Sequence, residues 1–288
     1  MIKSIVRANS LEEALALLQD APYTILAGGT DLLPQLRAGK SFSPQLLDLQ
    51  ALRPALAKIS LQDDTLCIGA LCTHAQIQTD PLVQTWCPVL AAACRSVGSA
   101  QIRKRGTIAG NLVNASPAAD TAPTLAAVGA TAVLQHAAGS RTVAIEKLIC
   151  GPGRTCLQPG ELLTELRIPL QGQPWRGVYQ KVGPRSALQI SVASAALLQH
   201  PQFGCRIACG SVGPTVQRAR QCEALFSQRG QPKQAFAHAL QTDISPIDDI
   251  RATAQYRRDV LCNLIYQRYL EKEACAYACI HRDSHSAG

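Results

Sequence analysis

Aromatic side chains, charged side chains and long apolar runs are all scarce in this 288-residue chain. Aromatics make up 4% of the residues, too few for the stacking platforms that bind single-stranded nucleic acids. The net charge of +8 is spread along the chain and only Arg103-Lys104-Arg105 forms a tight basic run, so we expect no nucleic-acid partner. No apolar run reaches the roughly 18 residues that a membrane span needs, so we expect none.

Motifs for nucleophilic or metal-dependent catalysis are also missing. The sequence has no Cys-x-x-Cys pair, no His-Glu-x-x-His, no Gly-x-x-x-x-Gly-Lys-[Ser/Thr] and no recognisable Ser/His/Asp arrangement, and its six histidines are scattered. We therefore predict no metal site and no catalytic residue belonging to the chain itself. Such a chain can take part in redox chemistry when a bound cofactor supplies that chemistry.

Cysteine is abundant, with twelve residues. The N-terminal sequence Met-Ile-Lys-Ser-Ile-Val-Arg lacks the apolar region of a secretory signal. We therefore expect a cytoplasmic protein with reduced thiols that are mostly small buried hydrophobic residues.

Two stretches of small and polar residues stand out against this background. Residues 98–121 are rich in glycine, hydroxyls and amides, with little ordinary core between Gly106 and Asp120. Residues 26–33 place Gly28-Gly29 between a short β-type run and a plausible helix with Thr30 or Asp31 as its N-cap. Small residues let backbone N–H groups approach an anion, and a helix N-terminus favours negative charge. Two such loops suggest a nucleotide with a diphosphate.

The same stretches carry a family resemblance. Ala-Gly-Gly-Thr-Asp at 27–31 and Thr-Ile-Ala-Gly-Asn-Leu-Val-Asn-Ala-Ser-Pro-Ala-Ala-Asp at 107–120 closely resemble the two FAD-binding motifs of the flavoprotein subunits of molybdenum hydroxylases. That family includes FAD-binding subunits of xanthine dehydrogenases and the medium subunit of carbon monoxide dehydrogenase. Shorter similar segments follow over nearly the whole chain.

The resemblance implies a set of cofactor contacts. The backbone of Leu26–Asp31 would hold the FAD pyrophosphate, Asn114 and Asp120 the phosphate–ribityl portion, and Lys181 would lie near the flavin ring and tune it. An N-cap role on the following helix is the alternative for Asp120, and a plain core role the alternative for Leu162. The complete predicted set is Leu26, Ala27, Gly28, Gly29, Thr30, Asp31, Thr107, Ala109, Gly110, Asn111, Asn114, Asp120, Leu162 and Lys181.

The expected fold is α+β, with a two-part FAD-binding domain of the vanillyl-alcohol-oxidase (PCMH) type and a C-terminal domain built on a three-stranded antiparallel sheet with helices. We place a β-α-β unit at 1–55, a second FAD-binding subdomain at 56–170, the C-terminal domain at 176–280 and a polar tail at 281–288. Expected elements include a helix at 73–78 stopped by Pro81, a strand with a turn at 141–148, strands at 177–182, 191–200 and 205–210, and a long helix from 249 to 276.

By resemblance, the chain would be the FAD-binding electron-transfer subunit of a xanthine dehydrogenase-like enzyme. It would accept electrons from the [2Fe–2S] clusters of an iron–sulfur subunit, fed by a molybdopterin-binding subunit that carries the substrate site, in a dimer of heterotrimers. NAD is a possible acceptor. Gln189 stands where relatives often have an acidic residue, which leaves the acceptor open. A stand-alone FAD-dependent oxidase or dehydrogenase and a flavin-free scaffold subunit remain as alternatives.

Overall fold

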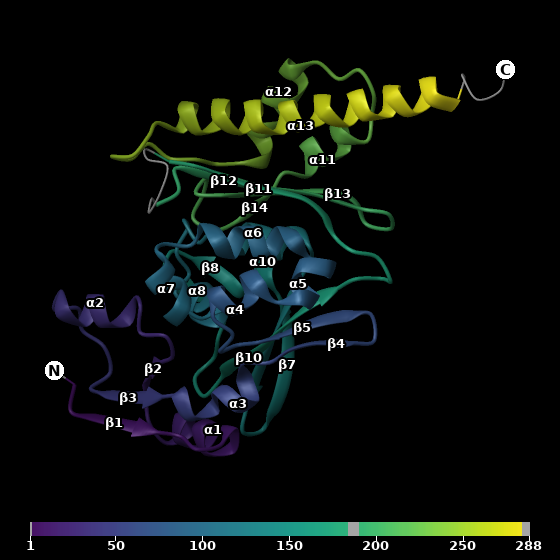
Figure 1. The fold of residues 1–288 in the computed structure, drawn as a ribbon. Coiled ribbons are helices and arrows are strands. Elements are labelled where there is room, and N and C mark those ends of the chain that lie inside the picture. The colour runs from purple at the N-terminus through teal and green to yellow at the C-terminus, as the bar shows by residue number, and fades with distance from the viewer. Residues whose placement is uncertain (1, 184–189, 284–288) are drawn as a thin grey trace.

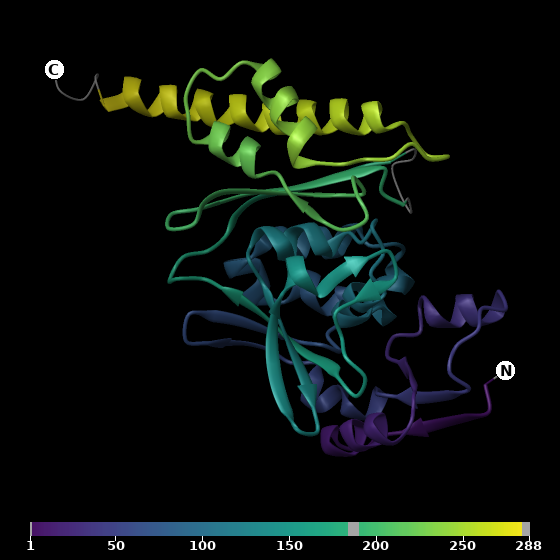
Figure 2. The same cartoon turned by 180° about the vertical axis from the view of Figure 1, so that it is seen from behind.

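A computed structural model describes residues 2–183 and 190–283, with side chains through residue 272. Its helices and sheets form successive layers, from a small N-terminal sheet through a larger middle unit to a C-terminal sheet covered by helices (Figures 1 and 2). The mixed α+β architecture is therefore confirmed. Gln189 and the end of the expected tail lie outside the described residues.

The N-terminal unit is a small parallel sheet with the strand order β1-β3-β2. Its strands are β1 (Ser4–Arg7), β2 (Thr24–Leu26) and β3 (Gln45–Asp48), and its helices are α1 (Leu11–Asp20) and α2 (Leu32–Arg37). The Ser10 side chain caps α1 by accepting a hydrogen bond from the Glu13 N–H at 3.1 Å. The short helices η1 (Gln50–Leu52) and α3 (Arg53–Leu56) lead into the next unit.

The middle unit has a five-stranded antiparallel sheet in the order β4-β5-β10-β6-β7. The strands are β4 (Ile59–Gln62), β5 (Thr65–Gly69), β6 (Thr131–His136), β7 (Gly139–Ala144) and β10 (Leu162–Pro169). Between β5 and β6 the chain forms α4 (His74–Thr79), α5 (Pro81–Trp86), α6 (Pro88–Ser96), α7 (Ala100–Arg105), α8 (Ile108–Val113) and α9 (Thr121–Ala127). Helix α10 (Ile145–Leu148) and the hairpin β8 (Ile149–Gly151) and β9 (Arg154–Thr155) precede β10.

The predicted elements of this unit agree with the structure only in part. Helix α4 ends at Thr79, before Pro81, as expected. Pro81 then begins α5, because proline suits the first turn and the Asp80 carboxylate accepts hydrogen bonds from the next two free N–H groups. Residues 145–148 are helical, so the strand expected at 141–148 ends earlier. The stretch after Gly106 is also not an open loop with little core, because Ile108 and Leu112 of α8 are fully buried.

The described part of the C-terminal unit contains four strands, one more than predicted. They are β11 (Arg176–Val182), β12 (Ala193–His200), β13 (Gly204–Gly210) and the two-residue β14 (Gln217–Arg218), which is too short to give a sequence signal. Helices α11 (Arg220–Phe226), α12 (Lys233–Asp243) and α13 (Ala254–Asp283) follow. The long helix begins five residues later than expected, because Asp249 lies in an irregular segment before it.

Strand β12 connects the two larger units, because both of its faces are buried. Leu198 belongs to the middle core, whereas Leu197 belongs to the core beneath α11, α12 and α13. A strand that is covered on both sides becomes almost continuously apolar, as Ala193–Leu198 is. The C-terminal sheet therefore lies between the α6 and α9 helices and its own helical layer (Figure 1).

Candidate functional site

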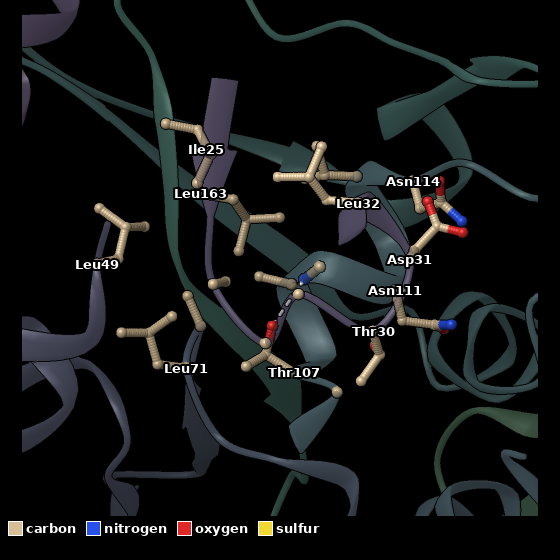
Figure 3. Close-up of a pocket in the computed structure, with 18 of the residues that line it drawn as sticks. Ile25, Thr30, Asp31, Leu32, Leu49, Leu71, Thr107, Asn111, Asn114 and Leu163 are labelled. Carbon is tan, nitrogen blue, oxygen red and sulfur yellow. Dashed lines mark hydrogen bonds between the residues drawn. The ribbon is translucent and has the colours of Figure 1, made fainter. Parts of the chain in front are cut away.

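A cavity of about 620 Å³ opens between the N-terminal sheet and the middle unit. Figure 3 shows that its two ends differ in chemistry. Apolar side chains from β2, the residue after β3, the β5–α4 turn and β10 gather at one end, where Ile25, Leu49, Leu71 and Leu163 are labelled. Most of the polar side chains lie at the other end, where Thr30, Asp31, Asn111 and Asn114 are labelled together with the apolar Leu32. A cavity of this size and mixed lining is typical of a site for a small molecule.

The first predicted motif supplies free donors to this cavity. No hydrogen bond within the described part of the chain uses the backbone N–H groups of residues 28–31. Gly29 has φ +70°, and Gly28 lies against the end of α7, where an added Cβ would be 2.1 Å from the Arg105 carbonyl oxygen. The glycine pair therefore lets the turn adopt its conformation and lets its backbone approach a neighbouring segment closely. Four unpaired N–H groups in succession form a good anion site.

In the second predicted motif, residues 107–120, the N–H groups at the start of α8 are already paired, contrary to expectation. The N–H groups of Ile108 and Ala109 donate to the carbonyls of Cys72 and Ala70, and those of Gly110 and Asn111 donate to Thr107. Because these donors are already used, the segment presents side chains to the cavity. The side-chain oxygen of Asn111, Oδ1, accepts a hydrogen bond from the Thr121 hydroxyl at 2.7 Å. The side-chain nitrogen of Asn111, Nδ2, is therefore left as a donor.

Most of the predicted cofactor residues line this one cavity. These are Ala27, Gly28, Gly29, Thr30, Asp31, Thr107, Ala109, Gly110, Asn111, Asn114 and Leu162. The lining does not include Leu26, Asp120 or Lys181. Asp31 occupies the N-cap position of α2, but its side chain accepts from Gln35 and does not cap the helix.

Asp120 and Lys181 form a buried ion pair with each other. The Lys181 ammonium donates to the Asp120 carboxylate at 2.8 Å and to the Ser96 carbonyl oxygen at 3.2 Å. The Tyr179 hydroxyl donates to the other carboxylate oxygen at 2.9 Å. Burial raises the pKa of Asp120 and outweighs the opposing effects of Lys181 and Tyr179. Asp120 makes no side-chain cap on α9, so its observed contacts join the middle unit to β11.

Substitution of Asp120 by Ala should lower the free energy of unfolding by about 3 kcal/mol, because it leaves the Lys181 ammonium buried without a carboxylate. The double variant Asp120→Ala/Lys181→Met should recover a large part of this loss in urea titrations. Asp31→Ala, which removes an exposed carboxylate, is the matched control and should change stability by less than about 0.5 kcal/mol. Equal losses in the single and double Asp120 variants would contradict a stabilising pair.

Sequence reasoning missed the apolar wall and His74. Leucine and isoleucine side chains on strands resemble core, so Ile25, Leu49 and Leu163 gave no distinct signal. His74 begins α4 and also lines the cavity. Burial, reinforced by the charge of Arg103, lowers the pKa of His74 to about 4, so the imidazole is neutral at neutral pH.

Comparison with known proteins identifies the family. Residues 1–171 match the family described as the FAD binding domain in molybdopterin dehydrogenase. The chain belongs to this family. Residues 179–272 match the CO dehydrogenase flavoprotein C-terminal domain. The resemblance drawn from the two glycine-containing motifs is thus confirmed, and so is the order of an FAD-binding domain followed by a C-terminal sheet domain.

Relatives of this FAD-binding family align over almost the full chain. The glyceraldehyde dehydrogenase medium chain of Sulfolobus acidocaldarius is 33% identical, with 93% of this chain and 97% of the relative covered. The 6-hydroxypseudooxynicotine dehydrogenase complex subunit alpha of Paenarthrobacter nicotinovorans is 30% identical, with 93% of each covered. Relatives of this kind confirm the prediction of an oxidoreductase component.

Solved structures of the family have the same fold. Carbon monoxide dehydrogenase from Hydrogenophaga pseudoflava matches with a TM-score of 0.84 and 28% identity, over 93% of this chain and 96% of that one. Quinoline 2-oxidoreductase from Pseudomonas putida 86 matches with a TM-score of 0.84 and 28% identity, over 96% and 98%. Because these TM-scores cover almost the whole of each chain, the FAD-binding part and the C-terminal part are arranged in the same way in all three proteins.

The cavity fits the cofactor of an FAD-binding family. Unpaired N–H groups at residues 28–31 suit a diphosphate, and the close approach at Gly28 leaves no room for a side chain. The apolar end suits a ring system and the polar end suits hydroxyl groups. The residues present therefore match a dinucleotide with aromatic ends.

Other features of this family member concern its thiols and helices. The ten cysteines with described side chains are free, and burial raises the pKa of Cys72 and Cys87 to about 12, so both are inert thiols.

Among the described residues, no three His, Cys, Asp or Glu side chains gather as metal ligands. Within the same part of the chain, no helix is long and apolar enough to cross a membrane.

Proposed function

We propose that this chain is the FAD-carrying electron-transfer subunit of a molybdenum hydroxylase complex. It would receive electrons from the [2Fe–2S] clusters of one partner subunit and pass them to NAD or another acceptor. A molybdopterin-binding partner would hold the organic substrate. The observation that carries the proposal is the run of four unpaired N–H groups along a cavity whose walls contain both family motifs.

The chain's own residues would bind and orient the cofactor. The N–H groups of residues 28–31 would donate to the diphosphate, and the Asn111 amide nitrogen would be a further donor from the second motif. Leu163 and the other apolar residues would exclude water around a ring. When bound, FAD supplies the redox chemistry for which the chain has no side chain of its own.

Asp120 and Lys181 remain predicted cofactor residues. Both have their strongest hydrogen bonds with each other, outside the cavity lining. A contact of either with the flavin therefore requires an exchange of partners. We accordingly assign the ion pair the role of joining β11 to α9. Tuning of the flavin by Lys181 would be a second, separate role.

The partner assignments rest on the relatives. One is named a medium chain and another a subunit of a dehydrogenase complex. We propose the same kind of assembly here, with an iron–sulfur subunit and a molybdopterin-binding subunit in a dimer of heterotrimers. We also propose that the three larger sheets mark subdomains at 1–55, 56–170 and 176–280.

Purification of the native assembly tests this proposal. We expect an absorption spectrum with flavin and iron–sulfur bands, about one FAD per copy of this chain on acid release, and two further subunits that co-purify. Reduction by substrate should require the molybdenum-containing partner. A colourless chain that resists reconstitution with FAD, or a purified single chain that oxidises an organic substrate unaided, would contradict the assignment.

A further inference from the structure

Helix α2 is unusual because it is apolar and yet none of its side chains is fully buried. Its sequence, Leu-Leu-Pro-Gln-Leu-Arg, has three leucines among six residues, but none of the six is buried and Leu33 is 42% exposed. A surface helix ordinarily packs an apolar face against the core. Figures 1 and 2 show α2 at the rim of the molecule, beside the cavity that it helps to line.

Hydrogen bonds attach the segment around α2 to the body of the molecule only through the ends of the segment. Every hydrogen bond made by residues 30–42 has its partner within residues 29–42, and no ion pair or ring contact among the described residues involves the segment. Beyond it, the Ser43 N–H donates to the Thr24 hydroxyl at 3.1 Å. A segment with few external contacts can shift at low cost in free energy.

Glycines stand at both ends of this segment. Gly29 has φ +70° and Gly39 has φ +78°, a region that costs other residues about 1 kcal/mol or more. The Gly39 N–H donates to the Leu36 carbonyl at 3.1 Å, and no atom lies within 4 Å of the position that a Cβ on Gly39 would occupy, so no other segment packs against the chain there. The two glycines are therefore suitable hinges for a movement of residues 30–38 and the turn after them.

The groups that the segment turns towards the cavity indicate what it covers. They are Thr30, Asp31, Leu32, Gln35 and Phe42. None of these side chains is basic, and the carboxylate of Asp31 repels phosphate, so the side chains of the segment do not suit a diphosphate, which the backbone N–H groups of residues 28–31 would hold instead. Leu32 and Phe42 suit the faces of a planar ring, whereas a carboxylate and an amide suit ribose hydroxyls.

We infer that residues 30–42 form a flap that closes over the nucleoside end of the bound dinucleotide. Closure buries Leu32 and Phe42 against the base, and the burial offsets the loss of freedom in the segment. The inference rests on the proposed function, because the ligand that it requires is FAD.

Hydrogen–deuterium exchange on the full-length chain, in its complex where one is purified, tests the flap. Saturating FAD should slow exchange of amides 33–40 about tenfold or more, and ADP, which carries the nucleoside and the diphosphate but no flavin, should do the same. FMN, which lacks that end, should leave these amides unchanged. Trypsin cleavage after Arg37 and Lys40 should show the same dependence on ligand.

Substitution of Phe42 by Ala should weaken FAD binding about tenfold and remove most of the protection, because the flap loses its largest contact. Leu61→Ala, on the far edge strand β4 and 41% exposed, is the control and should leave both unchanged. Measurable FAD binding with unprotected amides 33–40, or equal protection by FMN and ADP, would overturn the flap while leaving the proposed function intact. Absence of any FAD binding would overturn both.

Discussion

The Gly28→Val variant should contain almost no FAD. A Cβ at this position would lie 2.1 Å from the Arg105 carbonyl oxygen and 3.1 Å from the Gly106 Cα, and both are backbone atoms. The end of α7 cannot yield easily, because the Gly106 N–H donates to Ile102 at 2.7 Å and the Gly106 carbonyl accepts from His74 at 3.0 Å. The turn at residues 28–31 must therefore move away from the end of α7, and its free N–H groups move with it. We expect FAD affinity to fall about hundredfold, equivalent to about 2.8 kcal/mol, in titrations followed by flavin fluorescence.

The matched control for this steric effect is Gly204→Ala. Gly204 has φ +69° but no atom within 4 Å of the added Cβ, so the change introduces backbone strain without a clash. Flavin content should stay at the wild-type level. Gly28→Ala, with the smallest possible side chain, should already lower FAD affinity. Wild-type affinity in a folded Gly28→Val chain would rule out the proposed diphosphate site.

The Arg257→Met variant should lose about 3–5 kcal/mol of unfolding free energy, because it breaks a buried ionic network. The Arg257 side chain is 2% exposed, and its guanidinium donates to the Val192 and Ser211 carbonyls at 2.6 and 2.7 Å and to the Asp249 carboxylate at 2.6 Å. These bonds connect β12, the end of β13 and the segment before α13. Urea unfolding followed by far-UV circular dichroism measures the loss.

Arg251→Met provides the comparison, because Arg251 also pairs with Asp249 but is 36% exposed. It should cost about 1 kcal/mol or less. A loss of less than 1 kcal/mol for Arg257→Met as well would mean that water replaces the lost bonds, and the network would then contribute little to stability.

Acid should weaken the same network. Burial alone would raise the pKa of Asp249, but hydrogen bonds from Arg251 and the Ala252 N–H, together with the charge of Arg257, outweigh it and lower the pKa well below its usual value. An acid whose pKa is lower in the folded state contributes stability above its unfolded pKa and loses it as the pH falls. Stability should therefore decline from about pH 5 to about pH 2, and less steeply in Arg257→Met.

The sequence predicted the turn at Gly28-Gly29 well, because its conformation depends on local chemistry. The second motif was harder to predict. Small residues after Gly106 suggested an open loop with free N–H groups, whereas Ile108 and Leu112 are buried and the donors are taken by Cys72 and Ala70. Those partners come from the turn after β5, more than thirty residues earlier in the chain, and such pairings leave no local signal.

The site was likewise predictable only in part. Both motifs line the same cavity, but the roles assigned to individual residues stay predictions. The pairing of Asp120 with Lys181 could not be foreseen, because it depends on how β11 packs across α9. The apolar wall of the cavity could not be predicted for another reason. A leucine that lines a cavity and a leucine in the core occur in the same pattern of apolar residues in the sequence.

The position of β10 has a consequence for biosynthesis. This strand is the last of its sheet to be translated, yet it lies in the middle and pairs with both β5 and β6. In a nascent chain that stops before Leu162, this sheet therefore consists only of the separate hairpins β4-β5 and β6-β7. Their exposed edge strands are prone to pair with strands of other chains. Truncated products that end there should form insoluble aggregates, and chaperone demand should be greatest before that strand leaves the ribosome.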